Sequence, residues 1–287
     1  MYPPEFTYVR ADNLSEALDF LSSHENSRPL AGGQSLLPML KLRVIQPDYV
    51  VDIGRLNELK YVRSVVEGLR IGALTTYNEL LKSDQVKVLA PLLYQAVKTV
   101  GDFQVRNVGT LGGSVSQADP ASDAPVALTA LEAEFTLSSK GGNRVVKATE
   151  FFQGPFTTSL RSDELVTEIS VPALDGYVVK YRKVVRRAGD YALASMALAV
   201  KLRGGEVEDM RLSLGGVHDR PFRAFEVEKM VIGKKLDESL AKEVAEKVSS
   251  QINPPSDHRG GPWYRREVVK LMVEKALMEV KAGVGGQ

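Results

Sequence analysis

The sequence contains no cysteine in its 287 residues. This absence excludes disulfide bonds, thiolate zinc sites, a cysteine nucleophile and an iron–sulfur cluster held by this chain alone. The three histidines, His24, His218 and His258, lie far apart and show no paired ligand spacing, so an intrinsic metal site is not expected. They also suggest no catalytic triad.

The chain also lacks an excess of charge of either sign, because it contains 37 lysines and arginines and 36 aspartates and glutamates. A nucleic-acid or membrane-surface binder usually shows a basic excess, so neither class is expected. No apolar run approaches the roughly 18 residues of a membrane-spanning helix, and the N-terminal MYPPEFTYVRADN lacks the basic and apolar regions of a signal peptide. The hydrophobic share of 44% is typical of globular proteins, and we expect a cytoplasmic one.

Three familiar motifs are absent. The chain has no GxGxxG for a Rossmann dinucleotide site and no GxxxxGK[ST] for a P-loop. The segment GGSVS at 112–116 misses the GxSxG nucleophile elbow at its last position. Common nucleotide folds and the serine hydrolases are therefore not supported.

Two glycine-rich segments stand out instead. The stretch 99–123, TVGDFQVRNVGTLGGSVSQADPASD, combines glycines with hydroxyls and two acids, which predicts a loop for a phosphorylated cofactor. The second segment is a short strand at 29–31 that runs into Gly32-Gly33-Gln34-Ser35, where a simple tight turn is an equally good interpretation. Neither segment has a nucleophile or general base beside it, so cofactor binding is favoured over acid–base chemistry.

The hydrophobic pattern divides the chain into parts at 1–60, 61–175 and 176–287. The first is predicted to contain a helix from Leu14 capped by Asn13, and strands at 29–31 and 49–53. The second is predicted to contain strands at 69–73, 133–138, 144–148 and 165–172, helices at 77–82 and 87–100, and a buried segment at 124–131.

The third part changes character. Strands at 177–184, 192–203 and 207–215 predict a three-stranded antiparallel sheet, and helices at 225–233, 239–252 and 264–281 predict a helical layer over it. The basic run from Arg182 to Arg187 is read as a solvated face or a partner contact. The terminal AGVGGQ is expected to fray.

Together, AGGQSLLPMLKLR at 31–43 and VRNVGTLGGSVSQADPASD at 105–123 resemble the flavin-binding medium subunit of the molybdenum hydroxylases. This family includes carbon monoxide dehydrogenase, aldehyde oxidoreductases and xanthine dehydrogenase. The resemblance continues through DELVTEISVP at 163–172, YRKVVRRAGDYALAS at 181–195 and GGVHDRPFRAFEVE at 215–228. It implies an α+β fold: two FAD-binding subdomains of the vanillyl-alcohol oxidase (PCMH) type, then a C-terminal antiparallel sheet with helices.

The resemblance also implies where FAD would bind. Residues that would hold its pyrophosphate and neighbouring groups are Pro29, Leu30, Ala31, Gly32, Gly33, Gln34, Ser35, Leu36, Gly109, Thr110, Gly112, Gly113 and Ser114. Asp123 would hold the ribose or a polar edge nearby, and Val100 and Gly101 would lie near the isoalloxazine. Leu165 and Val166 would meet the adenine end or a ring edge through main-chain atoms.

Side chains near the flavin ring are implied by the same resemblance. Tyr191 would cover one flavin face, and Arg182 or Lys183 would stabilise the anionic reduced flavin electrostatically. The alternatives are a core aromatic for Tyr191 and a surface position for Arg182. Many relatives have histidine where Gln34 stands, and without that histidine or a cysteine the FAD is expected to be non-covalent.

The function implied is that of a FAD-carrying electron-transfer subunit within a heteromeric oxidoreductase. Iron–sulfur clusters would sit on a small partner subunit and molybdopterin on a large one, in a dimer of heterotrimers, and electrons would leave this FAD for an external acceptor. No side chain of this chain is expected to act on the substrate. The alternatives are a stand-alone FAD-dependent oxidase or reductase of the same fold, and a nucleotide-binding scaffold without redox chemistry.

Overall fold

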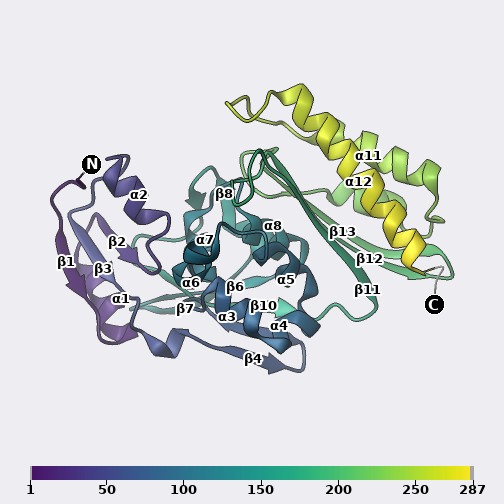
Figure 1. The fold of residues 1–287 in the computed structure, drawn as a ribbon. Coiled ribbons are helices and arrows are strands. Elements are labelled where there is room, and N and C mark those ends of the chain that lie inside the picture. Colours follow the sequence, from purple (N-terminus) through teal and green to yellow (C-terminus); the bar gives the residue numbers. More distant parts are fainter. Residues whose placement is uncertain (1, 285–287) are drawn as a thin grey trace.

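A small parallel sheet with two helices forms the N-terminal part (Figure 1). The computed structural model describes residues 2–284. In chain order the elements are β1 (Thr7–Arg10), α1 (Leu14–Ser23), β2 (Ser27–Leu30), α2 (Leu36–Lys41), β3 (Tyr49–Asp52) and the 3₁₀ turn Asn57–Leu59. Asn13 caps α1 as predicted, because its side chain accepts a hydrogen bond from the Glu16 N–H. The predicted strands of this part are confirmed, with ends shifted by one or two residues.

An antiparallel five-stranded sheet, in the order β4-β5-β10-β6-β7, forms the middle part. Its strands are β4 (Val62–Val65), β5 (Gly68–Gly72), β6 (Glu134–Ser139), β7 (Gly142–Lys147) and β10 (Leu165–Pro172), with a small hairpin of β8 (Phe152–Gly154) and β9 (Thr157–Thr158). Its helices are α3 (Tyr77–Lys82), α4 (Asp84–Leu89), α5 (Pro91–Val97), α6 (Phe103–Val108), α7 (Leu111–Gln117), α8 (Asp123–Ala130) and α9 (Ala148–Phe151). The predicted strands and the helix at 77–82 are confirmed.

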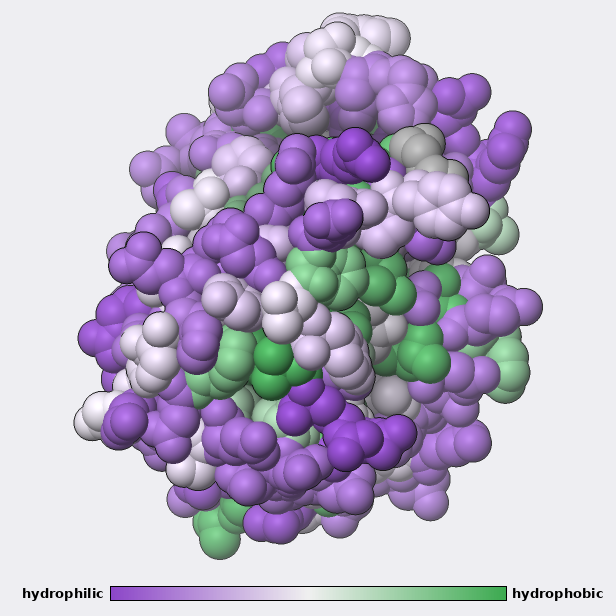
Figure 2. Space-filling model, turned by 90° about the vertical axis from the view of Figure 1, so that its left-hand side faces the viewer, coloured by the Kyte–Doolittle hydropathy of each residue, from purple (hydrophilic) through white to green (hydrophobic). Residues whose placement is uncertain are grey.

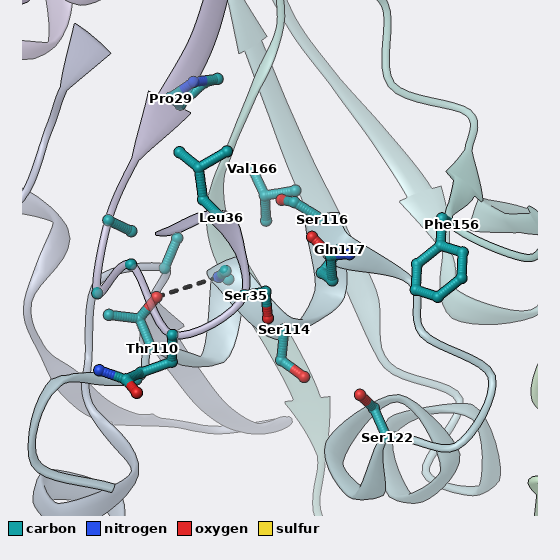
Figure 3. Close-up of a pocket in the computed structure, with 18 of the residues that line it drawn as sticks. Pro29, Ser35, Leu36, Thr110, Ser114, Ser116, Gln117, Ser122, Phe156 and Val166 are labelled. Carbon is teal, nitrogen blue, oxygen red and sulfur yellow. Dashed lines mark hydrogen bonds between the residues drawn. The ribbon is translucent and has the colours of Figure 1, made fainter. Parts of the chain in front are cut away.

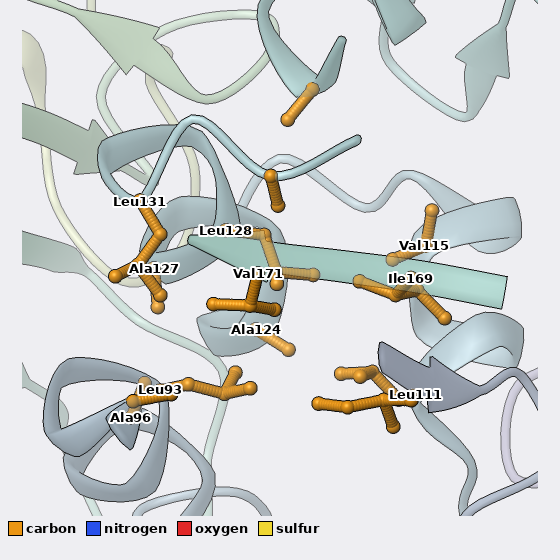
Figure 4. Packing of buried hydrophobic residues seen from close by; sticks show 14 of the residues in the cluster. Leu93, Ala96, Leu111, Val115, Ala124, Ala127, Leu128, Leu131, Ile169 and Val171 are labelled. Carbon is orange, nitrogen blue, oxygen red and sulfur yellow. The ribbon is translucent and has the colours of Figure 1, made fainter. Parts of the chain in front are cut away.

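Helix α8 lies at the centre of the molecule, and every one of its residues is buried. Figure 4 shows Ala124, Ala127 and Leu128 of α8 beside Leu93 of α5 and Val171 of β10. The other side of α8 contacts strands β12 and β13 of the C-terminal part. The middle and C-terminal parts therefore share a core, which explains why 124–131 is apolar all round and not amphipathic.

The single helix predicted for 87–100 is wrong. The chain forms α4 and α5 instead, and Ala90 between them has φ −132° and ψ 56°. Pro91 begins α5, where its missing N–H costs nothing. A proline also disfavours the helical conformation for the residue before it, so the break falls at Ala90.

The prediction of a loop across the glycine-rich stretch 99–123 is also wrong. Most of it is the helices α6 and α7, which Asp102 and Thr110 cap by accepting hydrogen bonds from the N–H groups of Val105 and Gly113. Glycine weakens a helix interior, but here the caps and tertiary contacts compensate. The glycines therefore serve a rigid scaffold.

The C-terminal part is an antiparallel sheet covered on one face by helices (Figure 1). Its elements are β11 (Tyr177–Val184), β12 (Ala194–Arg203), β13 (Glu206–Gly215), β14 (Phe222–Arg223), α10 (Phe225–Val231), α11 (Glu238–Gln251) and α12 (Pro262–Val284). The prediction of the sheet with its helical layer is confirmed, with the short β14 as an additional strand. Helix α12 continues to Val284, and residues 285–287 of the predicted frayed end lie outside the described residues.

The surface over the N-terminal part carries exposed apolar side chains. Figure 2, which views the molecule from the left-hand side of Figure 1, shows apolar side chains gathered near the centre of a mostly polar face. Leu37 and Leu42 of α2 and its C-terminal end, with Val44 just beyond, are 41%, 60% and 66% exposed. Within residues 2–284, no helix is both long enough and apolar enough to span a membrane.

Candidate functional site

A cavity of about 760 Å³ lies between the N-terminal and middle parts and reaches the β11–β12 loop of the C-terminal part. Figure 3 shows Ser35, Ser114 and Ser116 between Thr110 on one side and Phe156 on the other. The volume of the cavity is within the range of small-molecule and cofactor sites. Its lining combines serine and threonine residues with charged residues such as Asp123, Glu164 and Lys183. We take this cavity as the functional site.

The turn between β2 and α2 supplies backbone donors. Within residues 2–284, no backbone carbonyl or side chain accepts a hydrogen bond from the N–H groups of residues 32–36. Gly33 has φ +71°, in the left-handed region, and Ser35 has φ −106°, so successive N–H groups are turned out of the regular strand pattern. A run of free N–H groups in such a turn forms a concavity for an anion such as a diphosphate.

Gly32 also lets the two glycine-rich segments meet. A Cβ on Gly32 would lie 1.8 Å from the Val108 carbonyl oxygen and 3.0 Å from the Gly109 Cα, so no other residue fits there. The predicted pair of cofactor segments is therefore in direct backbone contact, although about 75 residues separate them in sequence.

Helix α7 forms the opposite wall, but its glycines mostly serve packing. A Cβ on Gly112 would lie 2.5 Å from the Ala73 Cβ, and the Gly112 N–H already donates to the Ala73 carbonyl. The Gly113 N–H is bound by the Thr110 hydroxyl oxygen at 3.1 Å (dashed line in Figure 3). In this wall the chain itself uses the N–H groups of residues 111–114, while the proton of the Thr110 hydroxyl stays available to a ligand.

One end of the cavity is formed where two glycine turns touch. Gly101 has φ +45° and Gly189 has φ +85°, and a Cβ on Gly189 would lie 3.2 Å from the Gly101 carbonyl oxygen. Arg106 fixes the first turn, because its Nη1 donates to the Val100 and Gly101 carbonyls at 2.7 and 3.1 Å. Tyr191, 44% exposed, lines the cavity from the second turn.

Buried charges lie behind this end. The Lys183 Nζ is 2.8 Å from an Asp123 carboxylate oxygen and donates to the Thr99 carbonyl at 3.2 Å. The other Asp123 oxygen accepts from the Tyr181 hydroxyl at 2.5 Å. Burial, together with the Asp123 charge, raises the pKa of Tyr181 well above its usual value, so the phenol stays protonated and donating.

The strand alternation separates the two basic candidates. Lys183 lines the cavity, whereas Arg182 lies on the opposite face of β11 and pairs with Glu279 of α12. Arg182 is therefore outside the cavity, as is Leu30, whose carbonyl accepts from the Ile53 N–H within the N-terminal sheet. Asp123 lines the cavity, but both of its oxygens already accept hydrogen bonds from this chain.

The far wall follows the start of β10. Leu165 and Val166 line the cavity, and so does Glu164, which precedes them. Glu164 accepts from Arg144 through both carboxylate oxygens at 2.7 Å, and this contact holds the pKa of Glu164 below its ordinary value.

Most of the predicted residues are thus brought to one cavity from all three parts of the chain. Those that line it are Pro29, Ala31, Gly32, Gly33, Gln34, Ser35, Leu36, Val100, Gly101, Gly109, Thr110, Gly112, Gly113, Ser114, Asp123, Leu165, Val166, Lys183 and Tyr191. Gln117 and the hairpin residues Phe156 to Thr158 also line the cavity and were not predicted from the sequence. The hairpin carries no motif, and only the tertiary fold places it there.

The donor set fits a dinucleotide such as FAD. A diphosphate suits the free N–H groups of residues 32–36 with the Thr110 hydroxyl across from them. A wide cavity lined by apolar and hydroxyl groups accommodates ring systems at either side of it.

Comparisons with known proteins agree with this site. The family model "FAD binding domain in molybdopterin dehydrogenase" matches residues 4–174, and "CO dehydrogenase flavoprotein C-terminal domain" matches residues 179–280. The chain is 65% identical over 280 residues to the glyceraldehyde dehydrogenase medium chain of Sulfolobus acidocaldarius, covering 98% of this chain and 100% of that one. It is 36% identical to the carbon monoxide dehydrogenase medium chain of Hydrogenophaga pseudoflava, covering 96% and 97%.

Solved structures give the same result. A carbon monoxide dehydrogenase structure from Hydrogenophaga pseudoflava matches with a TM-score of 0.95 and 37% identity over 98% of this chain and 99% of that one. Quinoline 2-oxidoreductase from Pseudomonas putida 86 matches with a TM-score of 0.94 and 31% identity over 99% of each chain. The predicted FAD-binding fold is confirmed, and FAD is the cofactor of this chain. The protein belongs to the family of FAD-binding medium subunits of the molybdenum hydroxylases.

Proposed function

We propose that this chain is the medium subunit of an aldehyde-oxidising molybdenum hydroxylase that works in the cytoplasm. The enzyme would consist of this chain, a small iron–sulfur subunit and a large molybdopterin subunit, as a dimer of heterotrimers. Bound FAD supplies the redox chemistry, taking electrons from the iron–sulfur subunit and delivering them to an external acceptor. The identity of 65% to a glyceraldehyde dehydrogenase medium chain, against 36% to a carbon monoxide dehydrogenase one, favours an aldehyde substrate.

The observation that carries the cofactor assignment is the row of free N–H groups at 32–36 facing the Thr110 side of one cavity. We assign the pyrophosphate to these groups and to the hydroxyls of Ser35 and Thr110. Tyr191 would lie over the flavin at the end that Val100 and Gly101 form, and Lys183 would be the nearby positive charge. Subdomain boundaries near residues 60 and 175 are part of the same proposal, with the FAD held mainly between the first two parts.

The chain's own residues bind, orient and shield the cofactor in this account. The substrate site would belong to the large subunit. The exposed Leu37, Leu42 and Val44, which lie close together in sequence, support membership in an assembly, because clustered exposed apolar residues commonly mark protein contacts.

The assignment is tested by purifying the native complex and comparing glyceraldehyde with carbon monoxide as the electron donor, using a dye as the acceptor. Dye reduction with glyceraldehyde by a complex of three unlike chains is expected. Reduction with carbon monoxide alone would overturn the aldehyde assignment. Turnover by this chain in isolation would instead support a stand-alone flavoprotein oxidase or reductase.

A further inference from the structure

Arg265, in the first turn of α12, is only 1% exposed and is the largest side chain that the described part of the chain buries completely. Its Nη1 donates to the carbonyls of Leu193 and Gly216 at 2.5 and 2.6 Å, and its Nη2 donates to the Asp257 carboxylate at 2.5 Å. A buried guanidinium is unfavourable unless its donors are paired. Its fork geometry allows it to join three separate chain segments at once.

Two of the three segments that Arg265 joins also contact the middle part. The Gly216 N–H donates to the Pro120 carbonyl at 2.8 Å, and the Ala192 N–H donates to the Ala121 carbonyl at 3.4 Å. At both places the amides bind the segment before α8, while neighbouring carbonyls bind Arg265. The guanidinium therefore fixes the β11–β12 loop at its junction with the cofactor-binding region.

A second set of contacts continues from Asp257 to the cavity. Asp257 accepts from the Arg259 N–H at 2.8 Å and from the Arg259 Nη1 at 3.3 Å. The Arg259 guanidinium carbon lies 6.0 Å from the centre of the Tyr191 ring, within the range of a cation–π contact. Neither Arg259 nor Arg265 lines the cavity, so both would act on it through Tyr191.

We propose that Arg265 is a positioning residue that, through Asp257 and Arg259, holds the Tyr191 loop against the cofactor cavity. This inference rests on the proposed function, because it assigns Tyr191 to the flavin. The C-terminal part thereby sets how closely the cavity end is covered, and with it how readily small oxidants reach the cofactor.

The first test is Arg259→Ala in the full chain loaded with FAD. This variant should disturb the fold little, because the Arg259 side chain is 27% exposed and its loss leaves no buried charge. A cation–π contact at such a site corresponds to a shift of about two- to five-fold in the population of the held loop. We expect reduced flavin to react with oxygen about two- to five-fold faster, and the visible circular dichroism of bound flavin to change. The control is Arg203→Ala, because the Arg203 side chain is 82% exposed at the end of β12 that is far from Tyr191. This variant should change neither the rate of the reaction with oxygen nor the circular dichroism.

A second test compares Arg265→Lys with Arg266→Lys. Lysine keeps the charge but cannot span both carbonyls and Asp257, whereas the Arg266 side chain bonds only the Ile252 carbonyl at the end of α11. Arg265→Lys should change flavin reactivity in the same direction as Arg259→Ala, and Arg266→Lys should not.

Double variants that also carry Tyr191→Ala show whether the two arginines act by positioning the Tyr191 ring or only by stabilising the fold. If the arginines act through the ring, Arg259→Ala and Arg265→Lys add no further change to flavin reactivity once Tyr191 is alanine. Additive effects on flavin reactivity would overturn the inference. If Arg265→Lys does not fold, the comparison of Arg259→Ala, Tyr191→Ala and their double variant decides the question alone. A wild-type chain that takes up no FAD would overturn the proposed function itself.

Discussion

Lys183 and Asp123 form an ion pair with 2.8 Å between Nζ and the carboxylate oxygen, and both side chains are almost fully buried, at 6% and 5% exposed. The pair joins β11 of the C-terminal sheet to the first residue of α8. Tyr181 donates to the second carboxylate oxygen, so Asp123 anchors two residues of β11 behind the cavity. The cofactor site and the domain junction are thus one structural unit.

Replacing Asp123 by alanine leaves the Lys183 ammonium buried without its carboxylate. Breaking a buried pair in this way costs about 3–5 kcal/mol of unfolding free energy, and urea denaturation measures it. Glu279→Ala, which removes an exposed pair with Arg182 on the other face of β11, should cost at most about 1 kcal/mol. Equal losses for the two variants would contradict the assigned role of Asp123.

Gly32→Ala tests the contact between the two glycine-rich segments. The new Cβ would fall 1.8 Å from the Val108 carbonyl oxygen, so the backbones must separate. We expect a loss of about 1–3 kcal/mol, measured by thermal unfolding, together with weaker FAD binding. The matched change Gly141→Ala, in the β6–β7 turn with its nearest neighbour 3.7 Å away, should be almost neutral.

The sequence carried enough information for most strands and for the cofactor segments. Local signals were sufficient where the sequence pattern and the burial agree, as in 133–138, where Phe135 and Leu137 are buried and Glu134 and Thr136 are partly exposed. The helices α6 and α7 were missed because glycine content outweighed two readable caps, Asp102 and Thr110.

Other features of the site depend on tertiary structure and have no local signal. Asp123 pairs with Lys183, 60 residues away, only because the tertiary fold brings the first residue of α8 next to β11. The side on which Lys183 and Arg182 lie is fixed by the register of β11 with β12, which the sequence does not state. Gly112 was assigned to the cofactor, yet its place in the fold is set by Ala73.

Gly113→Val addresses the wall opposite the donor turn. A Cβ there would lie 2.7 Å from the Thr110 Oγ1 and displace the hydroxyl that caps α7, so the cap and the ligand contact are lost together. We expect FAD affinity to fall roughly ten-fold or more, as followed by flavin absorbance after dialysis. The FAD affinity of Thr110→Val, which removes the hydroxyl without adding volume, should lie between those of Gly113→Val and wild type. Full flavin retention by a folded Gly113→Val would contradict the assignment of this wall.

Tyr191→Ala should leave FAD binding largely intact, because the ring covers the end of the cavity and does not form its donor wall. The rate at which reduced flavin meets oxygen or a dye should change, as stopped-flow absorbance can show. Tyr191→Phe keeps the ring and should behave like wild type. Unchanged kinetics for the alanine variant would mean that the ring serves packing only.

The Arg144–Glu164 pair predicts an acid-dependent loss of stability. Because Arg144 holds the folded-state pKa of Glu164 below its ordinary 4.5, the pair stabilises the fold above that value. The contribution is lost as the pH falls from about 4.5 through the lower folded pKa. Urea unfolding from about pH 7 to 3 should show a smaller drop for Glu164→Gln than for wild type. The neighbouring Asp163→Asn, at an exposed pair with Arg161, should follow the wild-type profile.

The most direct test of the account is the visible absorbance spectrum of the untagged protein purified from its native host, together with the chains that accompany it. We predict flavin and iron–sulfur bands in a complex with two unlike partner chains, and flavin bands alone once this chain is separated and reloaded with FAD. A chain that stays colourless after FAD is added would contradict the cofactor site and the function built on it.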